Sequence, residues 1–145
     1  MKRLILIIAT GGALAALVGA AGAQSPTTLE LVQLERDTRS GFVDNPPRRR
    51  ESAGDLFTVR GRVRDTAGKA VGSAQAEFTQ TGPRSGQGSA TFSLAGGRIM
   101  ITGALAGRGD DTLAIAGGSG SYAGASGTVQ IVEGRGRTEF RFSFR

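Results

Sequence analysis

The 145-residue sequence contains no cysteine and no histidine. Without these side chains the chain lacks disulfides, zinc sites of the usual kind and the Ser-His-Asp and Cys-His pairings of hydrolytic enzymes. It also lacks the side chain that most often transfers protons near neutral pH. We therefore expect no metal site and no cofactor. Any catalysis must come from shaping a reactive substrate rather than from strong acid–base groups.

Charge is missing from the first part of the chain after its first three residues. Lys2 and Arg3 precede an uncharged apolar run over 4–18, and Ala21-Gly22-Ala23 fits the small-x-small pattern before a cleavage site. This layout predicts a secretory signal peptide. A transmembrane anchor is the alternative, although the run is rich in Gly and Ala and Pro26 follows it. No cysteine follows the run, which disfavours a lipid-anchored lipoprotein.

These features divide the chain into three parts. We predict a signal peptide over 1–23, a flexible lead-in over 24–28 and a single β-domain over 29–145. The expected location is the periplasm or the medium, reached by the general export route, with no stable membrane anchor after cleavage. Removing 1–23 leaves 16 basic and 12 acidic residues, a net charge of +4. An exported chain of this charge is not expected to bind nucleic acid; a polyanion or a membrane surface is the alternative.

Alternating apolar and polar residues give the clearest structural signal. Between Leu56 and Asp65, one face carries Phe57, Val59, Gly61 and Val63, and the other carries Thr58, Arg60, Arg62 and Arg64. Period two predicts a strand with one dry face. The arginine row is then the solvated face of the strand, and an anion-binding site is the alternative.

Similar signals recur along the domain. We expect further strands over 29–34, 72–81, 88–95, 98–106, 112–116, 128–133 and 138–145. The apolar phase changes between Leu31 and Val32, which indicates a bulge. The polar segment 37–54 is predicted to be a long loop, and 117–127 a glycine-rich connection. About eight short strands without a helix favour a sandwich or a closed barrel, and an eight-stranded barrel holds side chains or one small ligand.

Two segments carry a family resemblance. Val71–Thr79 is similar to the Gly-x-Ala-Gln-Gly-aromatic-aromatic strand of dirigent proteins. Ala114–Gly127 resembles the Gly-Gly-Thr-Gly-x-aromatic-x-x-Ala-x-Gly signature shared by dirigent proteins and allene oxide cyclases. Leu34-Glu35-Arg36-Asp37 and Gly54-Asp55-Leu56 add weaker matches to allene oxide cyclases. The resemblance spans most of 29–145 in the right order.

The resemblance implies an all-β fold, an eight-stranded antiparallel β-barrel of lipocalin-like shape with a ligand cavity, and a homotrimer. Allene oxide cyclases close an unstable epoxide into a cyclopentenone, and dirigent proteins guide radical coupling. The family's functional positions fall here on Val32, Leu34, Ala74, Ser121 and Ser126, so the resemblance assigns no catalytic residue. The structural glycine signature comprises Gly117, Gly118, Gly120, Gly124 and Gly127.

The expected function is binding of a small apolar molecule inside the barrel. Candidate pocket-lining residues are Leu34, Ala74, Ala76, Phe78, Phe92 and Tyr122. Tyr122, the single tyrosine, has a second interpretation as a cap on the barrel end. Two alternatives remain open: an isomerase or cyclase that folds its substrate in the cavity, and a structural protein whose barrel is filled.

Overall fold

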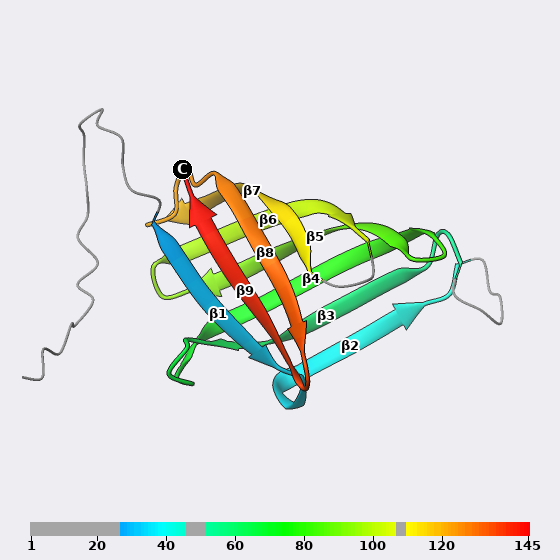
Figure 1. Ribbon diagram of the computed structural model, residues 1–145, viewed down its shortest axis with the longest axis horizontal. Helices are drawn as coiled ribbons and strands as arrows, with labels where there is room; N and C mark the ends of the chain where they lie inside the picture. The colour runs from blue at the N-terminus through cyan, green and yellow to red at the C-terminus, as the bar shows by residue number, and fades with distance from the viewer. Residues whose placement is uncertain (1–26, 46–51, 107–109) are drawn as a thin grey trace, which may run out of the picture.

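The computed structural model describes residues 27–45, 52–106 and 110–145 (Figure 1). These residues contain nine antiparallel strands and one turn of 3-10 helix. The predicted signal peptide over 1–23 and most of the lead-in lie outside these residues. The elements are β1 (Thr28–Leu34), η1 (Glu35–Asp37), β2 (Thr38–Val43), β3 (Leu56–Arg64), β4 (Ala70–Gly82), β5 (Ser85–Leu94), β6 (Gly97–Leu105), β7 (Asp111–Gly120), β8 (Gly127–Gly134) and β9 (Arg137–Phe144). Within the described residues, no helix has the length and apolar character needed to cross a membrane.

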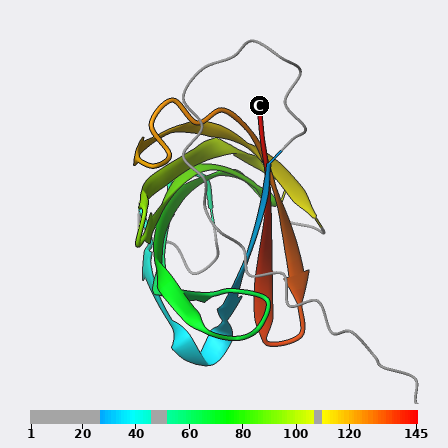
Figure 2. The same cartoon turned by 90° about the vertical axis from the view of Figure 1, so that its left-hand side faces the viewer.

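The strands form one sheet that closes on itself. Their order is β1-β9-β8-β7-β6-β5-β4-β3-β2, and β1 also pairs with β3 where Val32 lies opposite Arg64. This contact closes an eight-stranded antiparallel barrel and leaves β2 outside it, along the length of β3. Figure 2 shows β4, β5 and β6 curving round one side, with β1, β9 and β8 crossing the other. The prediction of an eight-stranded antiparallel barrel is confirmed.

One end of the barrel is densely filled. Side chains between 0% and 1% exposed converge there from six strands: Leu31, Val63, Phe92, Ile99, Ile101, Val129 and Phe142. The Phe92 ring contacts the rings of Phe140 and Phe142 edge to face, with centroids 4.9 and 5.1 Å apart. We call this the packed end. Its residues are the inward-facing members of the alternation predicted from the sequence.

The predicted loop over 37–54 is wrong in its first part. Residues 35–37 form η1, and Thr38–Val43 form β2, paired with β3 from Gly61 to Leu56. Every residue of β2 after Thr38 is exposed. An edge strand outside the barrel buries no face, so it leaves no apolar alternation in the sequence. Its backbone pairing with β3 defines it instead.

The bulge predicted in the first strand is also absent. The seven residues of β1 pair in unbroken register with Ser143 to Arg137 of β9. Leu29, Leu31 and Gln33 therefore share the inner face, and Val32 and Leu34 lie on the other. The apparent phase change arose because a glutamine occupies an interior position.

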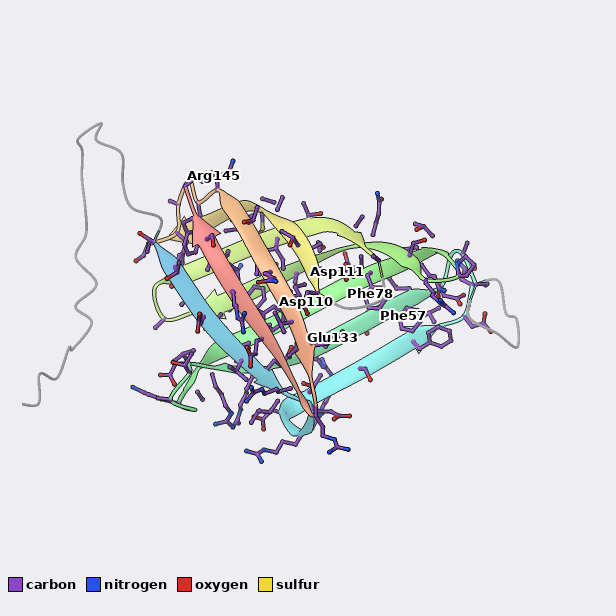
Figure 3. All side chains as sticks on the ribbon, viewed as in Figure 1. Phe57, Phe78, Asp110, Asp111, Glu133 and Arg145 are labelled. Atoms are coloured by element: carbon purple, nitrogen blue, oxygen red, sulfur yellow. The ribbon has the colours of Figure 1, made fainter. Side chains whose placement is uncertain are left out.

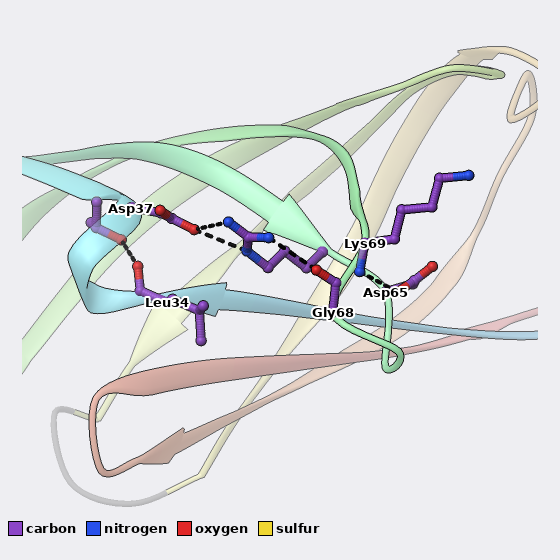
Figure 4. A network of polar contacts seen from close by, with 7 residues as sticks. Leu34, Asp37, Asp65, Gly68 and Lys69 are labelled. Carbon is purple, nitrogen blue, oxygen red and sulfur yellow. Dashed lines mark hydrogen bonds and ion pairs between the residues drawn. The ribbon is translucent and has the colours of Figure 1, made fainter.

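An ion pair fixes the junction of β1, β2 and β3 (Figure 4). Arg64 donates from Nε and Nη2 to Asp37 Oδ2, at 2.9 and 2.7 Å, and from Nη1 to the Gly68 carbonyl at 2.9 Å. Thr38 Oγ1 donates to the Leu34 carbonyl across η1, at 2.8 Å. The hydrogen bond from Arg64 holds the pKa of Asp37 below its ordinary value. These contacts lie where the barrel closes.

Candidate binding cavity

The end of the barrel opposite the packed end is not filled. A cavity of about 70 Å³ lies there, lined by residues of all eight barrel strands, among them Leu105 at the end of β6 and Leu113 near the beginning of β7. Ala74 and Ala76 of β4 and Gly88 and Ala90 of the neighbouring strand β5 line one wall of it, with Ala76 paired directly with Ala90. Alternation turns these residues inward, and their small size leaves the space that large side chains fill at the other end.

Four of the six candidate pocket residues lie together in this cavity: Ala74, Ala76, Phe78 and Phe92. Leu34 does not line it, since the regular alternation of β1 places its half-buried side chain on the opposite face. Tyr122 follows the end of β7, at the packed end. Its ring lies 6.3 Å from that of Phe144, so it covers that end of the barrel.

Gln33 is the buried polar residue of the cavity, and the sequence interpretation missed it along with apolar lining residues such as Leu113 and Phe140. Its side chain is 7% exposed and lines the cavity, and its Nε2 is buried without a hydrogen-bond partner among the described residues. The amide lies over Gly61, where an added Cβ would approach Nε2 to 2.6 Å. Continuing the inward phase of Leu29 and Leu31 by two residues would have found Gln33. The interpretation expected an apolar residue there.

An apolar path leads from the cavity to the surface. Phe78 lines the cavity and stacks on Phe57 at 4.7 Å, and Phe57 contacts Phe42 of the outer strand at 4.8 Å. Phe42 is 50% exposed. Figure 3 shows Phe57, near the beginning of β3, beside Phe78, in the second half of β4. The three rings extend the cavity wall to solvent.

The cavity lining carries almost no charge. Glu77 is its single titratable residue, and Glu77 is exposed and out of phase with the inward-facing Ala76 and Phe78. In the described ranges no group of three or more acidic, His or Cys side chains is placed to hold a metal ion. The buried carboxylate of Asp55 lies elsewhere and serves the fold, because it accepts hydrogen bonds from the backbone N–H groups of Asn45 and Ser52. The site therefore offers shape, apolar surface and one amide donor.

The glycine signature is part of the packed end and does not belong to the cavity. Gly117, Gly118 and Gly120 lie inside β7 and Gly127 lies in β8, so the predicted connection over 117–127 is too long by five residues. Gly124 lies in the turn after β7, and Gly127 begins β8. A Cβ on Gly118 would overlap the carbonyl oxygens of Tyr122 and Arg98, and one on Gly127 would overlap that of Ser143. These glycines allow close approach of backbones at a crowded barrel rim.

Fold and cavity together define a class: closed antiparallel β-barrels with a small apolar cavity at one end. No family model and no curated protein sequence matches the chain. Solved structures do, at low sequence identity. A structure described as pyocyanin demethylase is 20% identical with a TM-score of 0.71, covering 82% of this chain and all of that one.

Two other neighbours connect the fold with the predicted resemblance. A pterocarpan synthase dirigent protein is 17% identical with a TM-score of 0.61, over 83% of this chain and 92% of its own. The Diels-Alderase AbmU from Streptomyces koyangensis is 16% identical with a TM-score of 0.60, over 86% of this chain and 71% of its own. The chain thus has the barrel fold of dirigent proteins and of these cyclases, and the resemblance drawn from the sequence is confirmed at the level of fold.

Proposed function

We propose that the chain binds a small, mainly apolar molecule that carries one hydrogen-bond-accepting oxygen. The unpartnered Nε2 of Gln33 in an otherwise apolar cavity supports this most directly. A buried donor left without a partner costs about 1–3 kcal/mol. A ligand carbonyl, ether or hydroxyl oxygen at Nε2 would remove this cost, while Ala74, Ala76 and Phe78 would contact the carbon skeleton.

The cavity volume bears on how such a molecule binds. Pockets that enclose a whole drug-sized ligand measure roughly 300–1,000 Å³, whereas this one measures about 70 Å³. We therefore infer that one end of the ligand enters the cavity and the rest lies along Phe78, Phe57 and Phe42. Flat or elongated molecules suit this path, because aromatic faces stack best on flat apolar surfaces.

Co-purification tests this proposal. The mature protein, purified from its own host, is analysed by native mass spectrometry. A small bound molecule whose occupancy falls in Gln33→Leu supports the proposal. A barrel that stays empty after incubation with host lipid extract contradicts it and favours the alternative of a structural protein with a filled barrel.

We also propose export to the periplasm or medium, and assembly as a homotrimer. The charged start, apolar run and small-x-small site of the first 23 residues support export. The resemblance to dirigent and allene oxide cyclase barrels supports the trimer. N-terminal sequencing of the secreted protein should begin at Gln24, and sedimentation velocity should give three times the mass of one chain. An uncleaved N-terminus or a monomer would contradict the respective proposal.

Cyclisation of a bound substrate is the second candidate function. Cycloadditions form carbon–carbon bonds without proton transfer, so a cavity without acid–base side chains suffices if it holds the reacting ends together. The neighbours described as Diels-Alderases and as a cyclase catalysing [4 + 2] cycloaddition support this candidate. Incubation with a linear polyene that carries a diene and an alkene tests it. Wild type should accelerate ring closure and Ala74→Phe should not; equal rates with and without wild-type protein would contradict it.

A further inference from the structure

The outer face of the barrel carries a second feature, independent of the cavity. Arg39 of β2 lies directly opposite Arg60 of β3. The row continues across the sheet, with Arg60 opposite Gln75 and Gln75 opposite Thr91. Two guanidinium groups, an amide and a hydroxyl therefore stand side by side on four adjacent strands. We call these four residues the donor row.

The donor row lies in a groove. A depression of about 630 Å³ over β2 to β5 and a neighbouring one of about 380 Å³ are both lined by all four residues of the row. Arg62, also exposed, lines the second depression and lies opposite Ser73. The surface is thus hollowed where the donors gather.

The arginines of the donor row form no ion pair with a carboxylate, in contrast to three other arginines in the described part of the chain. Arg64 pairs with Asp37, and Arg137 and Arg141 both pair with Glu139. Among the described residues no ion pair joins Arg39, Arg60 or Arg62 to a carboxylate, although Glu77 lines the larger depression and Asp37, which pairs with Arg64, lines the second. Like charges directly opposite on neighbouring strands destabilise a sheet. An anion between the two guanidinium groups would reverse this repulsion.

We propose that the donor row binds an oxyanion of the phosphate type. Guanidinium groups match phosphate oxygens with paired, charge-assisted hydrogen bonds, and Gln75 and Thr91 add neutral donors on the same row. The oxyanion is either free phosphate or a lipid phosphate headgroup, which share this chemistry. The site is separate from the cavity, because Arg39, Arg60, Gln75 and Thr91 face away from the barrel interior and none of them lines the cavity.

A titration of the full mature chain tests the site. ¹⁵N-labelled protein at low ionic strength is titrated with inorganic phosphate, and separately mixed with vesicles of phosphatidylcholine alone or with phosphatidylglycerol. Phosphate should shift the amides of Arg39, Arg60, Gln75 and Thr91. The Arg39→Gln/Arg60→Gln double variant should bind at least about 10-fold more weakly, as expected for loss of charged hydrogen bonds. The matched control Arg98→Gln removes an exposed arginine of β6 and should bind within about twofold of wild type, since charged groups of separate sites act nearly independently.

The outcomes of this titration distinguish the two sources of the oxyanion, free phosphate and lipid headgroups. Binding of free phosphate assigns the site to small anions; binding only of vesicles that contain phosphatidylglycerol assigns it to lipid headgroups. Absence of both, or an equal loss in Arg98→Gln, overturns the proposal. Thermal melting adds a second measurement, because the ligand should raise the melting temperature of wild type and leave that of the double variant unchanged. Without ligand the double variant should melt no lower than wild type, since it removes a repulsion.

Discussion

The two ends of the barrel are built from the same alternating strands and differ in the size of their inward side chains. At the packed end Leu31, Ile99 and Phe142 fill the interior to 0–1% exposure, and the equally buried Phe92 packs against Phe142 while also lining the cavity. At the cavity end Ala74, Ala76 and Gly88 leave about 70 Å³ unfilled, and Gln33 keeps an unpartnered amide there. The contrast indicates that the packed end stabilises the fold, while the cavity end gives up stability and leaves space for the ligand that we propose.

Removing a large side chain from the packed end should give the largest effect. Phe92→Ala deletes a fully buried ring that contacts Phe140 and Phe142. We expect a loss of about 3–5 kcal/mol in the free energy of unfolding, the usual cost of Phe→Ala in a core. Urea denaturation followed by circular dichroism measures it. A loss below about 1 kcal/mol would show that this end is not the source of stability.

Enlarging a side chain at the cavity end should lower the free energy of unfolding less than Phe92→Ala does, and it should block binding of the proposed ligand. Ala76→Leu places a branched side chain into the unfilled space and should change the free energy of unfolding by no more than about 1–3 kcal/mol. Binding of the co-purifying ligand should be lost. The surface substitution Ala104→Leu on β6 is a control that adds the same atoms to an exposed position. Unchanged ligand binding in Ala76→Leu would place the binding site elsewhere.

Replacing the unpartnered glutamine should raise stability. Gln33→Leu removes a buried donor that has no partner and keeps a similar volume, so the free energy of unfolding should increase by about 1 kcal/mol. The same urea titration measures this gain. A decrease of that size would mean that the Gln33 amide is already satisfied in the empty protein, and it would remove the argument for a polar ligand atom.

The smallest expected effect concerns the ion pair between Asp37 and Arg64, which lies where the barrel closes and belongs neither to the packed end nor to the cavity. Because the pKa of Asp37 is lowered in the folded chain, its contribution to stability is complete at neutral pH and is lost as the pH falls below 3.8 through the folded-state value. Urea midpoints at pH 7 and pH 3 should therefore lie closer together in Arg64→Gln than in wild type. An equal shift in both proteins would show that the pair does not contribute.

The sequence predicts the barrel better than it predicts the site. Eight strands follow from alternation, because each buries one face, and four pocket residues follow from the inward phase of β4 and β5. The outer strand β2 buries nothing, so Thr38–Val43 left no pattern to read. The sequence places Leu34 in the pocket in place of Gln33, because the prediction of the inward face rests on hydrophobicity alone. The pairing of Arg39 with Arg60 depends on the register of that same outer strand.

A pair of isosteric probes tests the central claim most directly. Cyclopentanone and methylenecyclopentane have the same shape, and only the ketone offers an oxygen to Gln33 Nε2. Each is titrated into the labelled protein while the cavity methyl groups and the Gln33 side-chain amide are observed by NMR. We predict that the ketone binds about 2- to 10-fold more tightly than the alkene, as expected for one hydrogen bond, and that Gln33→Leu abolishes the preference. Equal affinity for both probes in wild type, or no binding of either, would contradict the account.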